Sequence, residues 1–171
     1  MAQRQINTFT GKRITLTTST SYDVVLDRLN KEIQPSGPAS LDSLNASGDI
    51  TKDGFSEYFS THVGPHGFIQ FHEFDHGQWI QLFGIGNGLR MKRVLLGNPF
   101  VAITMLKHDL NSGLHVPVEL LLKELEGRKG TEVVYVLPSS LIASVNPDEK
   151  LQSAAKELDR KFEALATHIA S

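Results

Sequence analysis

A strand runs directly into a helix in the stretch Arg93-Val94-Leu95-Leu96-Gly97-Asn98-Pro99-Phe100. The first four of these residues suit a strand, which stops at Gly97. Asn98 supplies a side-chain oxygen that can cap a helix, and Pro99 stands at the first helical position, where its missing N–H costs nothing. We therefore predict a strand from residue 93 and a capped helix over 98–108, with polar groups gathered at their junction.

Strand patterns lie on both sides of this stretch. Residues 68–75 alternate apolar and polar side chains, and residues 79–83 are predicted to be their hairpin partner, with His76-Gly77-Gln78 at the turn. Further along the chain, residues 117–125 and 131–137 flank a short loop that contains two glycines, which is typical of a second hairpin. The hairpin order favours an antiparallel sheet.

Helical patterns are clearest near the two ends of the chain. Apolar residues recur at helical spacing over 21–33, where Thr20 and Asp23 are placed as a capping pair. Apolar residues from 151 to 169 form one long stripe, which follows a second Asn-Pro step at Asn146-Pro147, with Asn146 as the predicted helix cap. Both segments are expected to be amphipathic helices that cover the sheet.

These elements predict a single α+β domain over residues 1–171, a mostly antiparallel sheet with helices packed on one face. A further strand at 13–18 and a short helix near 55–59 belong to the same pattern. The segment around 34–52 is rich in serine, proline and glycine and is predicted to be a polar loop insertion.

The amino-acid composition of the chain excludes several classes of function. The chain has 17 basic and 19 acidic residues, no cysteine and 40% hydrophobic residues. No Lys/Arg block stands out, so nucleic acid is not an expected partner. The absence of cysteine excludes thiol nucleophiles and thiolate metal sites. No run approaches the roughly 20 apolar residues of a membrane helix, and the first residues lack a signal-peptide core. We expect a cytoplasmic protein that is not attached to a membrane.

The segment His72-Glu73-Phe74-Asp75-His76 matches the zinc-protease pattern H-E-x-x-H. That chemistry needs a helix, because two histidines four residues apart then share one face. On a strand they would lie about 13 Å apart, too far for one ion. Since the flanking residues resemble strands, we predict no metal site, and a metal-dependent hydrolase remains only an alternative. Residues 84–88 resemble a dinucleotide loop superficially, so no cofactor is predicted.

The same segment carries two acids and two imidazoles, which suit proton transfer near neutral pH. We predict His72, Glu73, Asp75 and His76 as catalytic groups that line a cavity. The competing interpretation, given equal weight, is that the acids are solvated and the histidines are ordinary turn residues.

Four further side chains are predicted to contact a substrate. Trp79 offers a flat apolar wall with one N–H donor, and Phe74 lies beside it in the predicted hairpin. Asn98 is first of all a helix cap, and its amide serves a ligand only where the cap leaves a donor free. His115 lies just before a strand and can point into the same cavity, although alone it is more often a loop residue.

Residues 93–99, the step Gly113-Leu114-His115-Val116-Pro117 and the hairpin ending at Pro138 resemble the domain of unknown function 302 family. The segment from Phe71 to Trp79 is similar to fungal members. The resemblance implies a small α+β domain with an antiparallel sheet, often a homodimer, with no established activity. Many bacterial members have Cys-Arg where this chain has Val118-Glu119, so chemistry built on that thiol is absent here.

Three functions follow from these observations. The favoured hypothesis is a cofactor-independent isomerase, cyclase or lyase of secondary metabolism, which moves protons on a small aromatic or polyketide-like metabolite. The second is a non-catalytic small-molecule-binding or dimerisation module that uses Phe71, Phe74 and Trp79 as an interface. The third is the metal-dependent hydrolase that uses His72 and His76.

Overall fold

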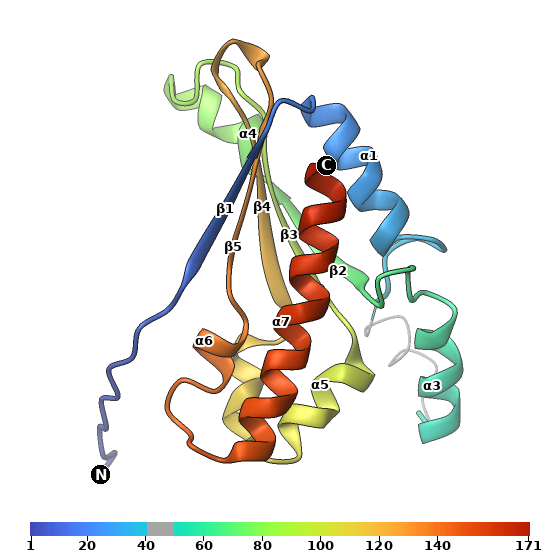
Figure 1. The fold of residues 1–171 in the computed structure, drawn as a ribbon, viewed down its shortest axis with the longest axis vertical. Coiled ribbons are helices and arrows are strands. Elements are labelled where there is room, and N and C mark those ends of the chain that lie inside the picture. The colour runs from blue at the N-terminus through green and yellow to red at the C-terminus, as the bar shows by residue number, and fades with distance from the viewer. Residues whose placement is uncertain (41–49) are drawn as a thin grey trace.

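A five-stranded antiparallel sheet forms the centre of the computed structural model, which describes residues 1–40 and 50–171 (Figure 1). Residues 41–49 of the predicted polar loop lie outside the described residues. The strand order across the sheet is β1-β5-β4-β3-β2. Their bounds are β1 Arg13–Thr18, β2 Ile69–Asp75, β3 Met91–Gly97, β4 Val118–Glu124 and β5 Thr131–Val136. The predicted α+β class with an antiparallel sheet is confirmed.

The longer helices lie on one face of this sheet, where Figure 1 shows α1, α5 and α7 in front of the strands. The helices are α1 Tyr22–Ile33, α3 Lys52–Ser60, α4 His76–Ile80, α5 Pro99–Leu106, α6 Ser139–Ile142 and α7 Glu149–Ala170. Short 3-10 turns are η1 Gln81–Phe83, η2 Leu110–His115 and η3 Glu126–Arg128. Within the described ranges, no helix is long and apolar enough to cross a membrane.

The core lies between the sheet and α7. The apolar stripe of α7 is fully buried at Leu151, Phe162 and Ile169, and it packs on inward-facing strand residues such as Leu120 and Val133. At roughly 1.5–3 kcal/mol for each large apolar side chain removed from water, this stripe is the main stabilising element of the domain. The opposite face of the sheet, called here the uncovered face, carries no long helix among the described elements.

The β3–α5 junction has the predicted form. The Asn98 side chain accepts a hydrogen bond from the backbone N–H of Phe100 at 2.9 Å, and Pro99 is the first helical residue. The Nδ2 of Asn98 donates to the carbonyl oxygen of Gly67 at 3.0 Å. Asn98 therefore caps α5 and also ties it to the loop before β2.

The predicted hairpin between residues 68–75 and 79–83 is wrong. β2 pairs with β3, and the intervening residues form α4 and η1. The side chain of Asp75 caps α4 by accepting from the backbone N–H of Gln78 at 3.2 Å. A Cβ on Gly77 would lie 2.7 Å from the backbone nitrogen of Met91, so this turn packs directly against the start of β3. Local capping and close packing thus favour a helical turn over a strand.

Two predicted helix caps are also wrong. The N-cap of α1 is Ser21, without a side-chain cap bond, and Thr20 instead bonds to Thr18. The cap of α7 is Asp148, which accepts from the backbone N–H of Leu151 at 2.8 Å. The predicted cap Asn146 instead accepts a hydrogen bond from the backbone N–H of Asp148, and so holds the actual cap residue in place before the helix begins.

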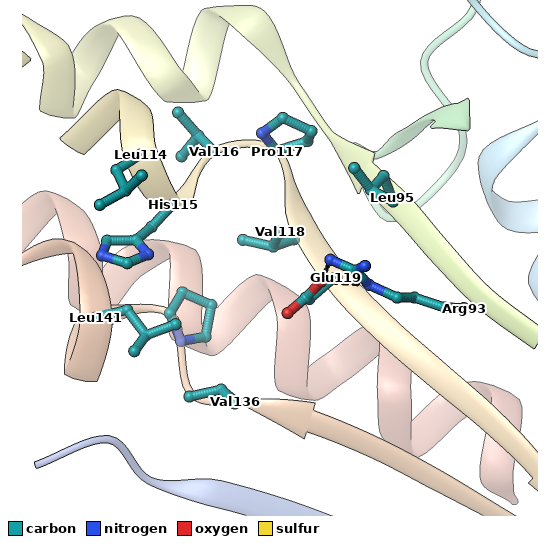
Figure 2. A pocket seen from close by; sticks show the side chains of 11 residues that line it. Arg93, Leu95, Leu114, His115, Val116, Pro117, Val118, Glu119, Val136 and Leu141 are labelled. Atoms are coloured by element: carbon teal, nitrogen blue, oxygen red, sulfur yellow. Dashed lines mark hydrogen bonds and ion pairs between the residues drawn. The ribbon is translucent and has the colours of Figure 1, made fainter. Parts of the chain in front are cut away.

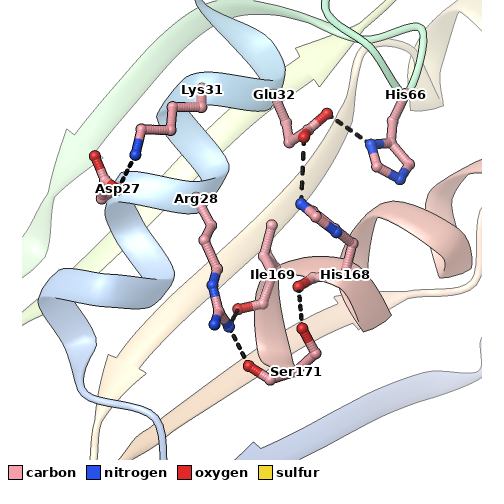
Figure 3. Close-up of polar contacts among 8 residues, drawn as sticks. All are labelled: Asp27, Arg28, Lys31, Glu32, His66, His168, Ile169 and Ser171. Atoms are coloured by element: carbon pink, nitrogen blue, oxygen red, sulfur yellow. Dashed lines mark hydrogen bonds and ion pairs between the residues drawn. The ribbon is translucent and has the colours of Figure 1, made fainter.

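A buried carboxylate joins α1 to α7 and to the loop before β2 (Figure 3). Glu32 is 8% exposed. Its two oxygens contact His66 Nδ1 at 2.6 Å and His168 Nε2 at 3.3 Å. The neighbouring Arg28 donates to the backbone oxygen of Ile169 at 3.4 Å. These contacts fix the end of α7 against α1.

Candidate functional site

The four residues predicted as acid–base groups do not converge. Alternate residues of a strand point to opposite faces. Glu73 pairs across the sheet with the buried Val94, whereas Phe74 pairs with Arg93 on the uncovered face. Glu73 and Asp75 therefore lie toward the helices, and His72 lies on the other side with Phe74. Because the side chains alternate between the two faces, the four residues do not line a single cavity as predicted.

Both carboxylates already have structural partners. Glu73 Oε1 forms an ion pair with Lys92 Nζ at 2.7 Å, and its other oxygen accepts a 3.4 Å hydrogen bond from Gln70. Asp75 caps α4. Each carboxylate thus stabilises the β2 edge of the sheet.

The H-E-x-x-H segment is not a helix. His72 lies within β2, and His76 is the first residue of α4. Among the described residues, no three His, Cys, Asp or Glu side chains are grouped as metal ligands.

An aromatic row follows the β2 edge of the uncovered face and continues onto α4 and η1. Successive ring centroids lie 4.6 Å apart for His72 and Phe74, 6.2 Å for Phe74 and His76, 6.0 Å for His76 and Trp79, and 6.4 Å for Trp79 and Phe83. Phe74 is 40% exposed and Trp79 is 52% exposed. The predicted contact residues Phe74 and Trp79 are therefore neighbours, but they lie on an open surface.

His115 lines a cavity of about 220 Å³ at the other end of the uncovered face (Figure 2). Across this cavity lie Arg93 and Glu119, which form an ion pair between β3 and β4. A neighbouring depression of about 340 Å³ shares these two residues and includes His76. Arg93 and Glu119 carry no distinguishing signal in the sequence, because β3 also contains Lys92 and β4 also contains Lys123 and Glu124.

A third cavity, here called the junction pocket, lies beside Asn98 and has a volume of about 250 Å³. Its lining is almost entirely apolar: Phe71, Gly97, Asn98, Val101, Ala102, Met105, Val116, Pro117, Val118 and Leu158. Phe71 reaches it because a bulge in β2 leaves this residue unpaired between Gln70 and His72. The lining contains no ionisable side chain. Of the predicted contact residues, only Asn98 belongs to it.

Asn98 offers this pocket one donor. Its oxygen is used by the helix cap and one amide hydrogen by Gly67, so the second amide hydrogen is the group left for a ligand. The four predicted contact residues are therefore distributed over three places: the aromatic row, the His115 cavity and the junction pocket.

The family model described as "Domain of unknown function DUF302" matches residues 53–169. The chain belongs to the DUF302 family. A crystal structure titled as an uncharacterized conserved protein DUF302 from Bacillus stearothermophilus is similar to it, with a TM-score of 0.61 and 18% identity over 93% of this chain and 98% of that one. At this identity the likeness shows a common fold. A comparison with curated proteins finds no match. In this DUF302 chain, the Asn98 cap and the hairpin of β4 and β5 lie within the matched region.

Proposed function

We propose that this chain is a non-catalytic small-molecule-binding protein whose ligand site is the junction pocket. The supporting observation is the lining: an apolar cavity of about 250 Å³ with one free amide donor and no acid or base. Ligand sites are typically concave and mostly apolar with few polar groups, in cavities of roughly 300–1,000 Å³. This pocket is slightly smaller, so its ligand is a small molecule or the end of a chain.

The proposal departs from the acid–base enzyme favoured by the sequence. General acid–base catalysis needs a proton donor and acceptor within hydrogen-bond reach of one substrate. The imidazoles and carboxylates of residues 72–76 face opposite sides of the sheet, and the carboxylates have structural partners. The isomerase, cyclase or lyase activity stays a prediction. So do the metal-dependent hydrolase, the cytoplasmic location and the similarity to fungal members.

Methionine methyl NMR with 1-octanol as a neutral apolar probe tests the ligand site. Met105 lines the junction pocket, whereas Met91 lies by the depression on the uncovered face. We expect the Met105 methyl resonance to shift on titration while that of Met91 stays in place. Ala102→Leu fills part of the pocket and should weaken binding. A shift at Met91 alone would move the site to the other face and overturn the proposal.

A homodimer is the second part of the proposal, and it rests on the uncovered face. Outward residues of the central strands are apolar at Leu95, Leu121 and Val134. Leu121 and Val134 are direct partners across the sheet, whereas Leu95 pairs with Glu119. A sheet that faces water on one side normally alternates to polar residues there. An apolar strip in the middle of this face, beside the ion pair of Arg93 and Glu119, is better explained by a second copy that covers it.

A further inference from the structure

A second depression runs along the contact between α5 and α7, on the side away from the sheet, and four of the ten residues that line it are basic when His108 is counted. It has a volume of about 650 Å³ and is here called the lysine groove. Its lining consists of Phe100, Val101, Thr104, Lys107, His108, Lys150, Ser153, Ala154, Glu157 and Lys161. Lys107, Lys150 and Lys161 form no ion pair with any described residue. Three unpaired ammonium groups along one groove are notable in a chain of net charge -2.

The acids near this groove are already engaged. Glu157 is paired with Arg160 at 2.6 Å, and its carboxylate also offsets part of the charge of Lys161. Asp148 is the cap of α7, and the pKa of its carboxyl is lowered by the backbone hydrogen bond from Leu151 and further by His108 and Lys150. The positive charge of the groove is therefore only partly offset, and the groove attracts anions.

The lysine groove adjoins the junction pocket at the first turn of α5. Val101 lines both. On α7, Leu158 of the pocket stands three residues before Lys161, a spacing that brings Cβ atoms to about 5–6 Å. A Cβ built on Gly67 would lie 4.0 Å from Lys161 Nζ, and the oxygen of Gly67 is bonded to Asn98. Lys161 therefore places its ammonium group near the Asn98 end of the pocket.

From this juxtaposition we infer that the ligand is an amphipathic anion: a small molecule with an apolar chain and one carboxylate or phosphate at its end. The chain enters the junction pocket, and the anionic group reaches Lys161, with Lys107, Lys150 and His108 further along the groove. The inference rests on the proposed function, because it names the ligand class for the same pocket. Each half accounts for one part of such a ligand: the apolar pocket encloses the chain, and the open groove offers the positive charge for its end.

Three probes with the same chain length separate the contributions: 1-octanol, octanoate and octyl phosphate, measured by calorimetric titration. A hydrogen bond to a charged partner contributes enough for about a tenfold difference in affinity. We expect both anions to bind about tenfold more tightly than 1-octanol, with a preference that falls as salt is added. Comparison of the two anions identifies whether a carboxylate or a phosphate is the better head group.

Lys161→Gln should reduce both anions to the affinity of 1-octanol and leave 1-octanol unchanged. Lys156→Gln is the matched control, because Lys156 is exposed on the same helix and lines neither cavity. Ala102→Leu should weaken all three probes, with folding checked by circular dichroism.

The outcomes distinguish this inference from the proposed function. If 1-octanol binds as tightly as the anions, the pocket is a ligand site but the anion is not recognised, and the inference fails alone. If the anions bind but Ala102→Leu leaves them unaffected, they bind to surface lysines only, and the inference is again overturned. If no probe binds, both the inference and the proposed function are rejected.

Discussion

At the scale of single residues, the ion pair between the half-exposed Arg90 and the buried Glu124 links stability to pH. Glu124 has a side chain that is 2% exposed, and its Oε1 lies 2.8 Å from Arg90 Nη2. The hydrogen bonds from Arg90 hold the pKa of the Glu124 carboxyl below its usual value of 4.5. A lowered pKa means that the folded state favours the charged form, so its contribution to stability is present above the unfolded pKa and is lost as pH falls through the folded one.

We therefore expect the free energy of unfolding to fall in acid below about pH 4.5 more steeply in the wild type than in Glu124→Gln. At neutral pH the substitution should cost about 1–3 kcal/mol, because it removes the buried charged partner of Arg90 and leaves that side chain only the exposed Asp23. Urea unfolding from neutral to acid pH measures both effects. Glu157→Gln removes an exposed pair with Arg160 and serves as the control. Parallel pH profiles for wild type and Glu124→Gln would contradict the assignment.

A second residue-scale prediction concerns Gly64, which lies against α1. A Cβ at this position would lie 1.6 Å from the backbone oxygen of Glu32. Gly64→Ala must therefore displace backbone, and a cost of about 2 kcal/mol or more is expected from overpacking. At Gly11, an added Cβ would meet ordinary contacts at 3.5 Å, so Gly11→Ala should be nearly neutral. Denaturant midpoints compare the two variants, and equal midpoints would refute the close approach.

At the scale of elements, the Asn98 cap is expected to control α5. Asn98→Ala removes both the cap bond to Phe100 and the bond to Gly67. We expect a loss of about 1–2 kcal/mol, in the upper range for N-caps. Asn98→Asp keeps the acceptor and loses only the donor, so it should recover most of the stability. Thermal unfolding measures both, and an unchanged midpoint for Asn98→Ala would show that the helix does not depend on its cap.

Elements with their own local signals were predictable from sequence. The Asn98-Pro99 step, the glycine-containing loop between β4 and β5 and the long apolar stripe of α7 each determine their structure locally. Residues 79–83 carry a strand-like composition, yet Trp79, Leu82 and Phe83 also recur at helical spacing, and the cap from Asp75 selects the helical form. In a segment this short, capping and tertiary contacts outweigh the strand propensity of the individual residues.

The candidate site was less predictable, for a physical reason. Residue types indicated chemistry at 72–76, but a strand sends neighbouring side chains to opposite faces, so proximity in sequence did not become proximity in space. The junction pocket gathers residues from β2, β3, α5, α7 and the start of β4. Among these residues, only Asn98 is marked by a local sequence pattern, the helix-capping Asn-Pro step. Arg93, Glu119 and the lysine groove likewise depend on pairing between elements distant in sequence.

At the scale of the whole molecule, the uncovered face predicts a homodimer. Phe74 and Trp79 are half-exposed, and Leu82, Phe83 and Ile85 beside them are 83%, 72% and 58% exposed. Aromatic anchors at the centre of an interface commonly contribute about 2 kcal/mol or more each. The double variant Phe74→Ala/Trp79→Ala should therefore weaken a dimer by about a thousandfold. Sedimentation equilibrium over a range of concentrations measures this change.

His72→Ala is the matched control for the dimer, because it lies in the same row with a smaller and less apolar ring. It should leave the association nearly unchanged. A wild-type chain that remains monomeric at the highest concentration measured would refute the dimer, and a double variant that dimerises normally would move the interface elsewhere on the sheet.

The ligand site and the expected dimer interface meet at the start of β4. Val116, Pro117 and Val118 line both the junction pocket and the His115 cavity of the uncovered face, so a second copy seated there would contact the wall of the ligand site. Binding and dimerisation are coupled only where that wall has two arrangements with different affinities. Val118 is held in register opposite Leu96, and both side chains are buried in the core, which favours a single arrangement. The affinity for 1-octanol should therefore agree within about twofold between the wild type and the Phe74→Ala/Trp79→Ala variant. A larger difference would identify the start of β4 as a mobile element that both partners move.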